Sequence, residues 1–406
     1  MLRFLTAGES HGPVLTGILD GVPAGVPLST ADIDVDLLRR QKGYGRGGRM
    51  EIEKDHVQFT AGVVAGHTTG APIGLLVENR DYRNWVEKDI APMTTPRPGH
   101  ADLTGAIKYG YRDLRLSLER ASARETTMRV AVGAICKKFM AQFGITVQGY
   151  VTEIGDVSVD LPPILEAEAY RQRFAAAEES DVRCPDPEAG ERIHAAIRAC
   201  IQAKDTLGGV VEVVAIGVPP GLGTHVQFDR KLDGQLMAAV GSVQSVKGVE
   251  IGRAFEQARW RGTQVHDEIV PDGAGNLRRR TNRAGGLEGG ITTGEPIVIR
   301  AALKPIATTL NPLQSVDLAT GEPRQIDYER SDFCQVPRGV VVIEAMVAYV
   351  LAAALIEKLG GDSVSEMAPR FAALRRSHVA DLPMDNAAWR FGYEYDFKGE
   401  AAKPRQ

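Results

Sequence analysis

The feature that most constrains the fold is an internal repeat whose parts recur in the same order. Four landmarks from the first quarter of the 406-residue chain recur in the same order after residue 205. One shared turn could arise by chance, whereas an ordered series is typical of a duplicated structural unit. The sequence therefore predicts two copies of one supersecondary unit, at approximately residues 1–145 and 205–360, within a single domain of residues 1–406.

The paired landmarks indicate what each copy contains. GILDGVPAG (17–25) matches VAIGVPPG (214–221), each an apolar β-like run closed by a Pro-Gly turn. Helix signals follow in STADIDVDLLRR, where Ser29 and Asp32 form a capping pattern, and in DRKLDGQLMAAV, opened by Asp229. Then come the glycine-bearing loops QKGYGRGGRMEIE and GSVQSVKGVEIG, and last GHTTGAPIGLLVEN (66–79) with GITTGEPIVIRAAL (290–303). Each copy thus reads strand, helix, strand, strand.

Long apolar segments follow both copies and predict helices at about 123–143 and 340–359. Two sheets packed against these helices give a layered α/β (α+β) fold, a β-α-β sandwich with a pseudo-two-fold axis. Residues 151–204 and 253–288 are predicted insertions, and 362–406 a tail. Because Glu344 interrupts the last apolar run and Gly-Gly ends it, we expect a buried helix there rather than a membrane span.

The composition limits the class of ligand. Lys and Arg number 48 against 52 Asp and Glu, so the chain as a whole has no basic field for nucleic acid or a membrane surface. The first residues, MLRFLTAGESHG, lack the apolar stretch of a signal peptide, and the four cysteines show neither CxxC spacing nor metal-like neighbours. We therefore expect a cytoplasmic protein without a disulfide or metal site, and without nucleic-acid or membrane partners.

Positive charge is nevertheless dense between residues 95 and 129, where seven Lys or Arg residues surround one Gly-His step. Ser122 followed by Glu125 predicts a capping box, which would place Arg120, Ala121 and Arg124 around a helix N-terminus. Such an end favours an anion, and a solvated, charged helix start fits the same pattern.

A second basic group, with Arg40 and Arg46, lies at a predicted helix end and in a glycine-rich loop. These arginines suit the binding of an anion. They equally suit a purely structural role, in which they stabilise the negative C-terminal end of the helix dipole. Its GxGxGG pattern follows a helix rather than a strand, so it is no dinucleotide fingerprint, and no segment fits a P-loop. Lys304 and Thr308 in KPIATT also suit an anion or the edge of a flavin ring.

Two histidines and one aspartate are candidates for proton transfer. His11 in GESHG and His100 in RPGHAD lie in turn-like sequence that is accessible to a ligand. RSDFCQVPRG (330–339) takes, relative to the second copy, the place of RPGHAD relative to the first, so Asp332 and His100 would approach one cleft from opposite sides. The alternatives are ordinary turn histidines and a structural ion pair for Asp332.

Three long segments resemble the signature motifs of the chorismate synthase family: GESHGPVLTGILDGVP (8–23), ERASARETTMRVAVGAI (119–135) and RSDFCQVPRGVVVIEAM (330–346). RPGHAD and KPIATT fit its pattern, and the similarity runs from Arg3 to about Gly361; Phe333 replaces the family's usual small residue or proline. The resemblance implies a homotetramer of β-α-β sandwiches. It also implies a lyase that converts 5-enolpyruvylshikimate 3-phosphate into chorismate and phosphate, the last common step of the shikimate pathway to aromatic amino acids. The reaction would be a 1,4-anti elimination that uses reduced FMN without net redox change.

The resemblance also implies roles for individual residues. His11 and His100 would be catalytic proton donors towards the reduced flavin and the departing phosphate, and Asp332 would assist flavin N5 in accepting the C6 proton. Arg40 and Arg46 match positions assigned to NADP, and their charge equally suits substrate carboxylates. The positions that match FMN contacts are Arg120, Ala121, Ser122, Gln244, Ser245, Gly289, Lys304, Pro305, Ile306, Ala307, Thr308 and Arg330.

The internal repeat adds a prediction about which copy binds which ligand. The loop with Arg40 and Arg46 is the counterpart of the loop with Gln244 and Ser245, so one copy is predicted to hold mainly substrate and the other mainly cofactor. No separate nicotinamide-binding domain is visible, which favours an external flavin reductase over self-reduction with NADPH. The competing functions are a flavin reductase without elimination activity and an RNA-binding protein, which the acidic balance opposes.

Overall fold

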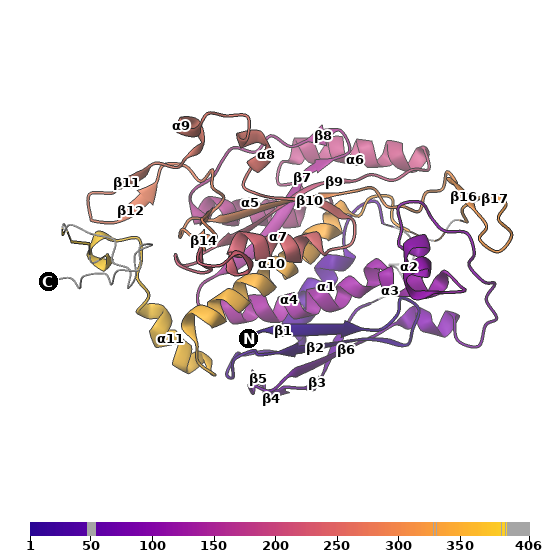
Figure 1. Cartoon of the computed structure of the whole chain (residues 1–406), viewed down its shortest axis with the longest axis horizontal. Helices are drawn as coiled ribbons and strands as arrows, with labels where there is room; N and C mark the ends of the chain where they lie inside the picture. Colours follow the sequence, from indigo (N-terminus) through magenta and orange to yellow (C-terminus); the bar gives the residue numbers. More distant parts are fainter. Residues whose placement is uncertain (47–53, 328, 330, 383, 386, 388–406) are drawn as a thin grey trace, which may run out of the picture.

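Two antiparallel sheets enclose a middle layer of helices in the computed structural model (Figure 1). It describes residues 1–46, 54–327, 329, 331–382, 384–385 and 387. The first sheet has strand order β1-β2-β6-β3, with β1 at Arg3–Ala7, β2 at Val14–Asp20, β6 at Ile73–Glu78 and β3 at Val57–Ala61. The second has order β10-β15-β9-β7-β8, with β10 at Val246–Ile251, β15 at Ile297–Leu303, β9 at Gly209–Ile216, β7 at Thr146–Ile154 and β8 at Val157–Ser158. The predicted β-α-β sandwich is confirmed.

The helices between the sheets supply much of the core. They are α1 (Thr30–Gln41), α4 (Thr126–Ala141), α7 (Leu232–Gly241) and α10 (Val336–Leu359). α4 and α10 pack side by side, and the closest approach is at Gly133, where an added Cβ would lie 2.3 Å from Ala345 Cα. Only glycine permits that approach, so the absent side chain at position 133 sets the spacing of the two central helices.

The two halves of the chain contain the same elements in the same order. β1, β2, α1, β3, β6 and α4 in the first half correspond to β7, β9, α7, β10, β15 and α10 in the second. Neighbouring strands also correspond, because β1-β2-β6-β3 has the same connectivity as β7-β9-β15-β10. This shared topology supports the predicted duplication.

In each half, the same pair of hydrogen bonds joins the repeated Pro-Gly turn to the threonine of the TTG segment. The Thr68 hydroxyl donates to the carbonyl of Pro23 (2.6 Å) and accepts from the amide of Val26 (2.9 Å). The Thr292 hydroxyl donates in the same way to the carbonyl of Pro219 (2.7 Å) and accepts from the amide of Leu222 (2.8 Å). The recurrence of GVPxG and TTG in the sequence therefore reflects one local structure that occurs twice.

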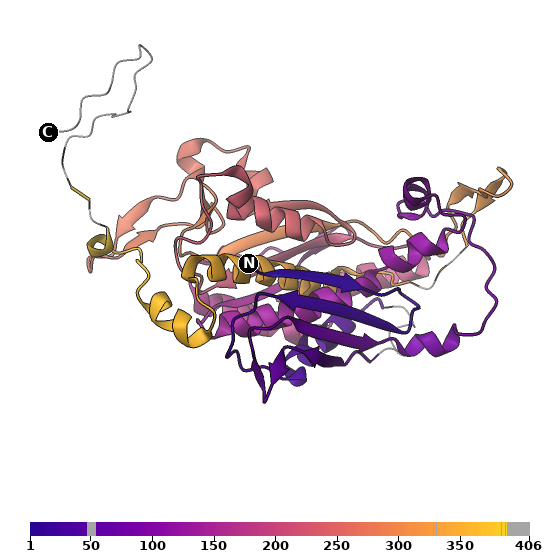
Figure 2. The ribbon, with the colours of Figure 1, turned by 60° about the horizontal axis from the view of Figure 1, so that its bottom comes forward.

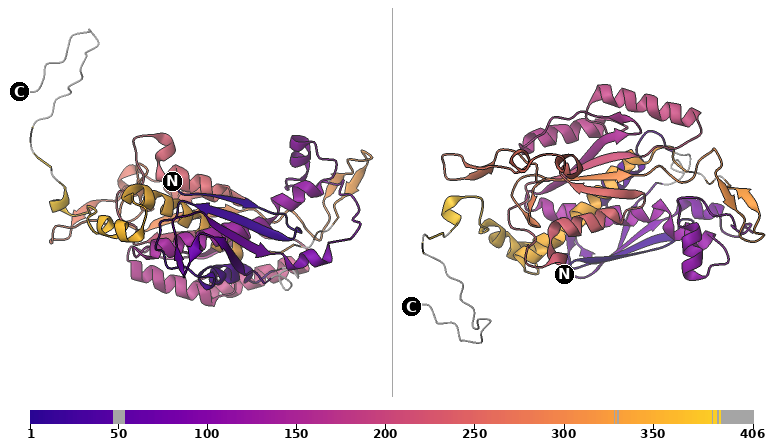
Figure 3. Two further views of the ribbon diagram at one scale, coloured as in Figure 1. Left: turned by 90° about the horizontal axis from the view of Figure 1, so that it is seen from below. Right: turned by 45° about the horizontal axis from the view of Figure 1, so that its top comes forward.

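The segments outside this common unit lie on the periphery. α5 (Ala167–Glu179) covers the outer face of the second sheet and α6 (Pro187–Gln202) lies next to β8, as the right panel of Figure 3 shows. The predicted insertion at 151–204 therefore needs a correction, because residues 151–154 belong to β7, which pairs with β9. The second predicted insertion, 253–288, contains the short helices α8 (Ala254–Gln257) and α9 (Gly262–Val265), the hairpin β11 (Ile269–Pro271) with β12 (Leu277–Arg279), and β13 (Leu287–Glu288), which pairs with β14 (Ile291–Thr292).

Two projections lie next to each other at one end of the molecule (Figure 2). One contains α2 (Asp102–Tyr109) and α3 (Arg115–Ala121), and the other is the hairpin of β16 (Gln314–Val316) and β17 (Pro323–Gln325). The amide of Leu318 donates to the carbonyl of Thr94, which ties the hairpin to the chain before α2. α11 (Val364–Ala372) lies towards the other end, and the hairpin of β4 (Val63–Val64) with β5 (His67–Thr68) lies at the lower edge of the first sheet (Figure 1).

The helix starts test the capping predictions. Ser29 and Asp32 form the predicted capping box of α1. Asp229 does not open α7, because it lies in a separate 3-10 turn, Phe228–Arg230, and Lys231 is the residue before the helix. α10 is long and apolar enough to cross a membrane, but 83% of its most apolar stretch is buried between the layers, as expected for a core helix.

Glu344, which interrupts the apolar run of α10, is fully buried in an ion-pair network. Its carboxylate accepts from Arg39 of α1 (2.7 and 2.9 Å), from Lys137 of α4 (2.6 Å) and from the amide of Gly149 in β7 (2.9 Å). Asp36 joins the same network through Arg39 and Lys137. The charge at position 344 therefore links α1, α4 and β7 to α10, and a buried carboxylate with this many donors is well compensated.

Candidate functional site

A cavity lies at the N-terminal ends of α4 and α10, between the two halves of the chain. Ser122 and Asp332 each stand four residues before the first residue of their helix, Thr126 and Val336. Asp332 is therefore the counterpart of Ser122, which corrects the expected correspondence with the segment of His100. The residues that line the cavity are Ser10, His11, Arg40, Trp85, Arg97, His100, Leu118, Ala121, Ser122, Ala123, Arg124, Ser245, Lys304, Ile306, Ala307, Thr308, Glu329, Ser331, Asp332, Gln335 and Arg338.

The charge of this lining favours anions. Five side chains are cationic, Arg40, Arg97, Arg124, Lys304 and Arg338, against the acidic Glu329 and Asp332. The N-terminal ends of two helix segments point to the same space and add partial positive charge. The cavity is thus electropositive although the whole chain is slightly acidic.

The N-terminus of α4 differs from the predicted capping box. The Ser122 hydroxyl accepts from the amide of Arg124 (3.3 Å) and caps a 3-10 turn, Ala123–Glu125, that precedes the helix. The Glu125 carboxylate accepts from Thr6 (2.8 Å), Arg129 and Gln244 (3.1 Å) rather than from the backbone of residue 122. Glu125 therefore joins the first half of the chain, through Thr6 and Arg129, to Gln244 of the second half.

His11 is held by a carboxylate and an aromatic ring. Its Nδ1 lies 2.6 Å from Glu119 Oε1, and its amide donates to Glu119 Oε2 (2.7 Å). The Trp85 ring lies against the imidazole, with centroids 4.1 Å apart. Burial alone would raise the pKa of Glu119, but its hydrogen bonds to His11 outweigh burial and lower that pKa. A charged Glu119 orients the ring, so Nε2 is the nitrogen left for a ligand.

His100 has a similar arrangement on the opposite wall. Its Nδ1 lies 2.5 Å from Asp102 Oδ1, and Arg97 Nη2 lies 3.0 Å from the same nitrogen. Arg97 also donates from Nε to Asp102 Oδ2 (2.8 Å). Burial opposes ionisation of Asp102, but hydrogen bonds from His100 and Arg97 outweigh it, and its pKa is well below the usual range. Asp102 therefore stays charged and fixes the imidazole.

A buried aspartate orients two of the arginines. Asp55, whose side chain is fully buried, accepts from Arg124 Nη1 (2.6 Å) and from Arg40 Nη1 (3.4 Å). Arg40 also donates to the hydroxyl of Thr126 (3.0 Å) and the carbonyl of Ala123 (3.0 Å). Burial, opposed by Asp55 and reinforced by nearby cations, lowers the pKa of Arg40 to about 9. The single carboxylate of Asp55 thus pairs with two arginines, Arg40 and Arg124. An anion in the cavity would therefore lie beside net positive charge.

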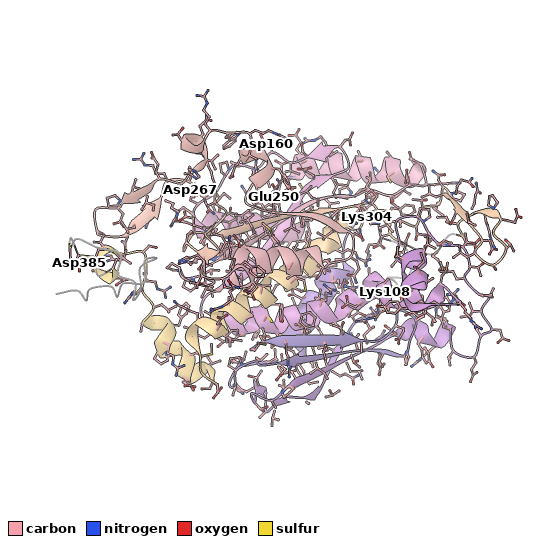
Figure 4. The ribbon with its side chains drawn as sticks, viewed as in Figure 1. Lys108, Asp160, Glu250, Asp267, Lys304 and Asp385 are labelled. Atoms are coloured by element: carbon pink, nitrogen blue, oxygen red, sulfur yellow. The ribbon has the colours of Figure 1, made fainter. Side chains whose placement is uncertain are left out.

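Arg338 on the first turn of α10 carries donors that lack a partner. Its Nη1 forms a close ion pair with Asp332, whereas its buried Nε and Nη2 have no hydrogen-bond partner among the described residues. Lys304 follows β15 and donates to the carbonyl of Gly99 (2.7 Å); Figure 4 shows its position at the end of that strand. Partial burial and the proximity of Lys247 lower the pKa of Lys304. Buried donors of this kind are expected to bind an acceptor from a ligand.

Apolar groups form another part of the wall. Leu118 and Ala121 of α3 face the same space as Ile306 and Ala307 of the loop after β15, with Trp85 nearby. A flat ring with a charged substituent would find both kinds of surface here, since apolar walls with a few placed polar groups are typical of cofactor sites.

The structure brings most of the predicted site residues together. His11, His100 and Asp332 line the one cavity, as do Arg40, Ala121, Ser122, Ser245, Lys304, Ile306, Ala307 and Thr308. Pro305 lies within the same loop without lining the cavity. The suggested roles of these residues stay predictions, because contact with a cavity does not identify the ligand.

Four predicted residues lie away from this cavity in the single chain. Arg120 donates to the carbonyls of Thr6, in the edge strand β1 of the first sheet, and of Gly8, just after that strand. The Gln244 side chain donates to Glu125, and Arg46 donates to the carbonyl of Gln41 (2.5 Å). Gly289 lies in the turn between β13 and β14, near His225, at the far end of the sheet from Lys304. Arg330 lies outside the described residues.

Several lining residues were not predicted as site residues. They are Ser10, Trp85, Arg97, Leu118, Ala123, Glu329, Ser331, Gln335 and Arg338, whereas Arg124, which was expected beside an anion at the helix N-terminus, also lines the cavity. Arg97 and Arg124 belong to the dense basic segment, and Arg338 stands six residues after Asp332, which places it on the first turn of the helix that follows. Among the residues described, no three His, Cys, Asp or Glu side chains are grouped as metal ligands would be. Cys334 is buried.

Comparisons of the sequence and of the structure with known proteins agree on one family. Residues 2–356 match the family model described as chorismate synthase. The chain is 54% identical over 383 residues to the chorismate synthase of Geobacter metallireducens, covering 90% of this chain and 96% of that protein. It is 52% identical over 383 residues to that of Aquifex aeolicus, with 91% and 96% covered. A solved structure called "Crystal Structure of Chorismate Synthase" superposes with a TM-score of 0.76 at 44% identity, covering 91% of this chain and 96% of that one. The chain therefore belongs to the chorismate synthase family, a family of lyases of the shikimate pathway.

Proposed function

We propose that this protein converts 5-enolpyruvylshikimate 3-phosphate into chorismate and phosphate in the cavity described above, with reduced FMN as cofactor. The observation that carries the proposal is the set of two carboxylate-bound histidines in a cavity with five cationic side chains. The substrate brings two carboxylates and a phosphate, which such a cavity suits. In the elimination the C3–O bond to phosphate breaks and C6 loses a proton.

The residues present fit a flavin phosphate and ring. The buried Nε and Nη2 of Arg338, which have no partner among the described residues, suit an anionic group, and Leu118, Ala121 and Ile306 suit a ring face. Ser245, Lys304 and Thr308 are the residues we assign to the cofactor side. Reduced FMN, when bound, supplies electron density to the substrate and recovers it, so that no net redox change occurs.

His100 is assigned to the departing phosphate. Asp102 and Arg97 hold its ring at the wall of the cavity, and Arg97 adds a positive charge next to the position where phosphate would leave. A proton on the imidazole, stabilised by Asp102, neutralises part of the developing charge on the leaving oxygen.

His11 and Asp332 are assigned to the cofactor and to the C6 proton. Glu119 and Trp85 fix the ring of His11, so the imidazole holds a proton at a defined place beside the flavin. Asp332 is the carboxylate that assists removal of the C6 proton, and its ion pair with Arg338 fixes its orientation.

Arg40 and Arg46 are assigned to the carboxylates of the substrate rather than to NADP, on grounds of charge. Arg40 lines the cavity, whereas Arg46 donates to the carbonyl of Gln41. Substrate binding by Arg46→Ala at fixed reduced FMN tests the second assignment, and an unchanged affinity would contradict it. We also propose a cytoplasmic homotetramer whose flavin is reduced by an external reductase.

An anaerobic reaction tests the function. The protein is supplied with dithionite-reduced FMN and substrate, and phosphate and chorismate are followed together. The expected result is equal amounts of both products without lasting flavin oxidation. Steady consumption of NADPH without phosphate release would instead identify a flavin reductase.

A further inference from the structure

Asn79 lies just after β6 and binds the loop that carries His11. It is 4% exposed, and its Nδ2 donates to the carbonyls of Glu9 (3.1 Å) and Gly12 (2.8 Å). Its own amide donates to the carbonyl of Pro13 (3.0 Å). These three bonds bracket His11 on both sides, so Asn79 holds the loop backbone together with Glu119, which binds the amide of His11.

The same amide is bound from the other side by the arginine pair. Asn79 Oδ1 accepts from Arg124 Nε (2.8 Å), and Arg124 Nη1 donates to Asp55. Because the carbonyls require the NH₂ and the arginine requires the oxygen, only one orientation of the amide satisfies every bond. The Asp55 carboxylate also accepts from Arg40, so a continuous buried chain runs from Arg40 to the His11 loop.

We propose that Asn79 is a positioning residue for His11, and that it couples the position of the His11 loop to the arginine pair that Asp55 holds. A shift of the Arg124 guanidinium on anion binding moves the hydrogen bond to Oδ1 and, with it, the two bonds to the loop. Asn79 itself does not line the cavity, so it acts through His11 and not on a ligand. The inference rests on the proposed function, in which His11 takes part.

A double-mutant cycle tests the proposal. Asn79→Ala should lower kcat about 10-fold to 100-fold in the chain that has His11, because small misplacements of a catalytic group have effects of this size. In the His11→Asn background the same change should lower the residual rate by less than about twofold, since Asn79 then has nothing left to position. Equal losses in both backgrounds would overturn the proposal and indicate a general structural role.

A second readout is independent of turnover. In the ligand-free protein, the imidazole C–H resonance of His11, identified by its loss in His11→Asn, should move in Asn79→Ala and in Asp55→Asn. Asn276→Ala, which removes an asparagine bonded to Asp272 in the remote β11–β12 hairpin, should leave it in place. An unmoved resonance in Asp55→Asn would refute the coupling, and this variant decides the question if Asn79→Ala does not fold. Absence of phosphate release by the unmodified protein would contradict the proposed function instead, with the resonance test still valid.

Discussion

His11 and His100 face one cavity from different segments, and each presents Nδ1 to a carboxylate, that of the partly buried Glu119 at 2.6 Å and that of the buried Asp102 at 2.5 Å. The arrangement leaves Nε2 of each ring for the ligand side of the cavity. Two oriented imidazoles among cationic side chains suit a reaction in which a phosphate leaves. The rate of phosphate release should therefore depend on both rings.

Replacement of His100 should affect the rate far more than binding. His100→Asn is expected to lower kcat about 100-fold to 10,000-fold, the range for a lost general acid. Phosphate release under anaerobic conditions measures it, with FMN affinity determined in parallel. His67→Asn is the control, because His67 is exposed in the β4–β5 hairpin away from the cavity. Wild-type kcat in His100→Asn would remove His100 from the mechanism.

Arg338 should matter for anion binding. Arg338→Gln loses donors that have no partner among the described residues, and it also releases Asp332. A charge-assisted hydrogen bond contributes about 1.5–3 kcal/mol, so affinity for FMN should fall roughly 10-fold to 100-fold. Equilibrium dialysis with FMN measures this. Arg120→Gln, which removes bonds to the edge strand β1 away from the cavity, should bind normally if the isolated chain contains the whole site.

Glu344 should be essential to the stability of the core. Glu344→Gln removes the fully buried counter-charge of Arg39 and Lys137 and leaves Asp36 as the carboxylate that pairs with both, and loss of one partner from a buried network costs about 3–5 kcal/mol. Urea denaturation measures the free energy of unfolding. Glu357→Gln on the same helix is the matched control, because its ion pair with Arg230 is exposed and should contribute under about 1 kcal/mol. Equal effects of the two changes would show that the buried network is not specially stabilising.

The same network predicts a loss of stability in acid. Burial alone would raise the pKa of Asp36, but Lys137 and Arg39 outweigh it and lower that pKa to about 2. The unfolded pKa is about 3.9, so this stabilisation is complete above about pH 4 and is lost as the pH falls towards 2. Asp36→Asn should be less stable than the unmodified chain at pH 6, and the difference should shrink at pH 3. A constant difference in urea midpoint would contradict the assignment.

The contact between α4 and α10 should reject even one methyl group. Gly133→Ala places a Cβ 2.2 Å from Ala345 Cβ, so we expect destabilisation by about 1–3 kcal/mol. Gly234→Ala in α7 is the matched control, since the nearest heavy atom to its new Cβ is 4.0 Å away. That change should stabilise the helix by up to about 1 kcal/mol. Thermal midpoints that move in the same direction for both variants would contradict this packing.

The parts of the fold that the sequence predicted share a local signal. The Pro-Gly turn and the TTG segment are short motifs that each occur twice, and in each half one threonine, Thr68 or Thr292, bonds to the turn that lies 45 or 73 residues earlier in the chain. β7 was assigned in part to an insertion because it lacks period-two alternation. α10 packs on one face of β7 and α5 on the other, so both faces are buried and the pattern disappears.

Some residues of the site could likewise be predicted from sequence motifs, and others could not. His11, His100 and Asp332 lie in distinctive motifs, and the structure brings them to one cavity. Asp55 and Asn79 have no such signal, since single buried polar residues acquire their meaning from partners distant in the sequence. Asp229 was wrongly placed as a helix cap because an intervening 3-10 turn shifts the start of α7.

The most direct test of the account is a crystal structure of the protein with FMN and 5-enolpyruvylshikimate 3-phosphate. We predict that both ligands occupy the cavity at the N-terminal ends of α4 and α10, with Arg338 and Lys304 bound to anionic groups and with both His11 and His100 in contact with a ligand. Ligands bound elsewhere, or a cavity that holds neither, would contradict the assignment of this cavity as the active site.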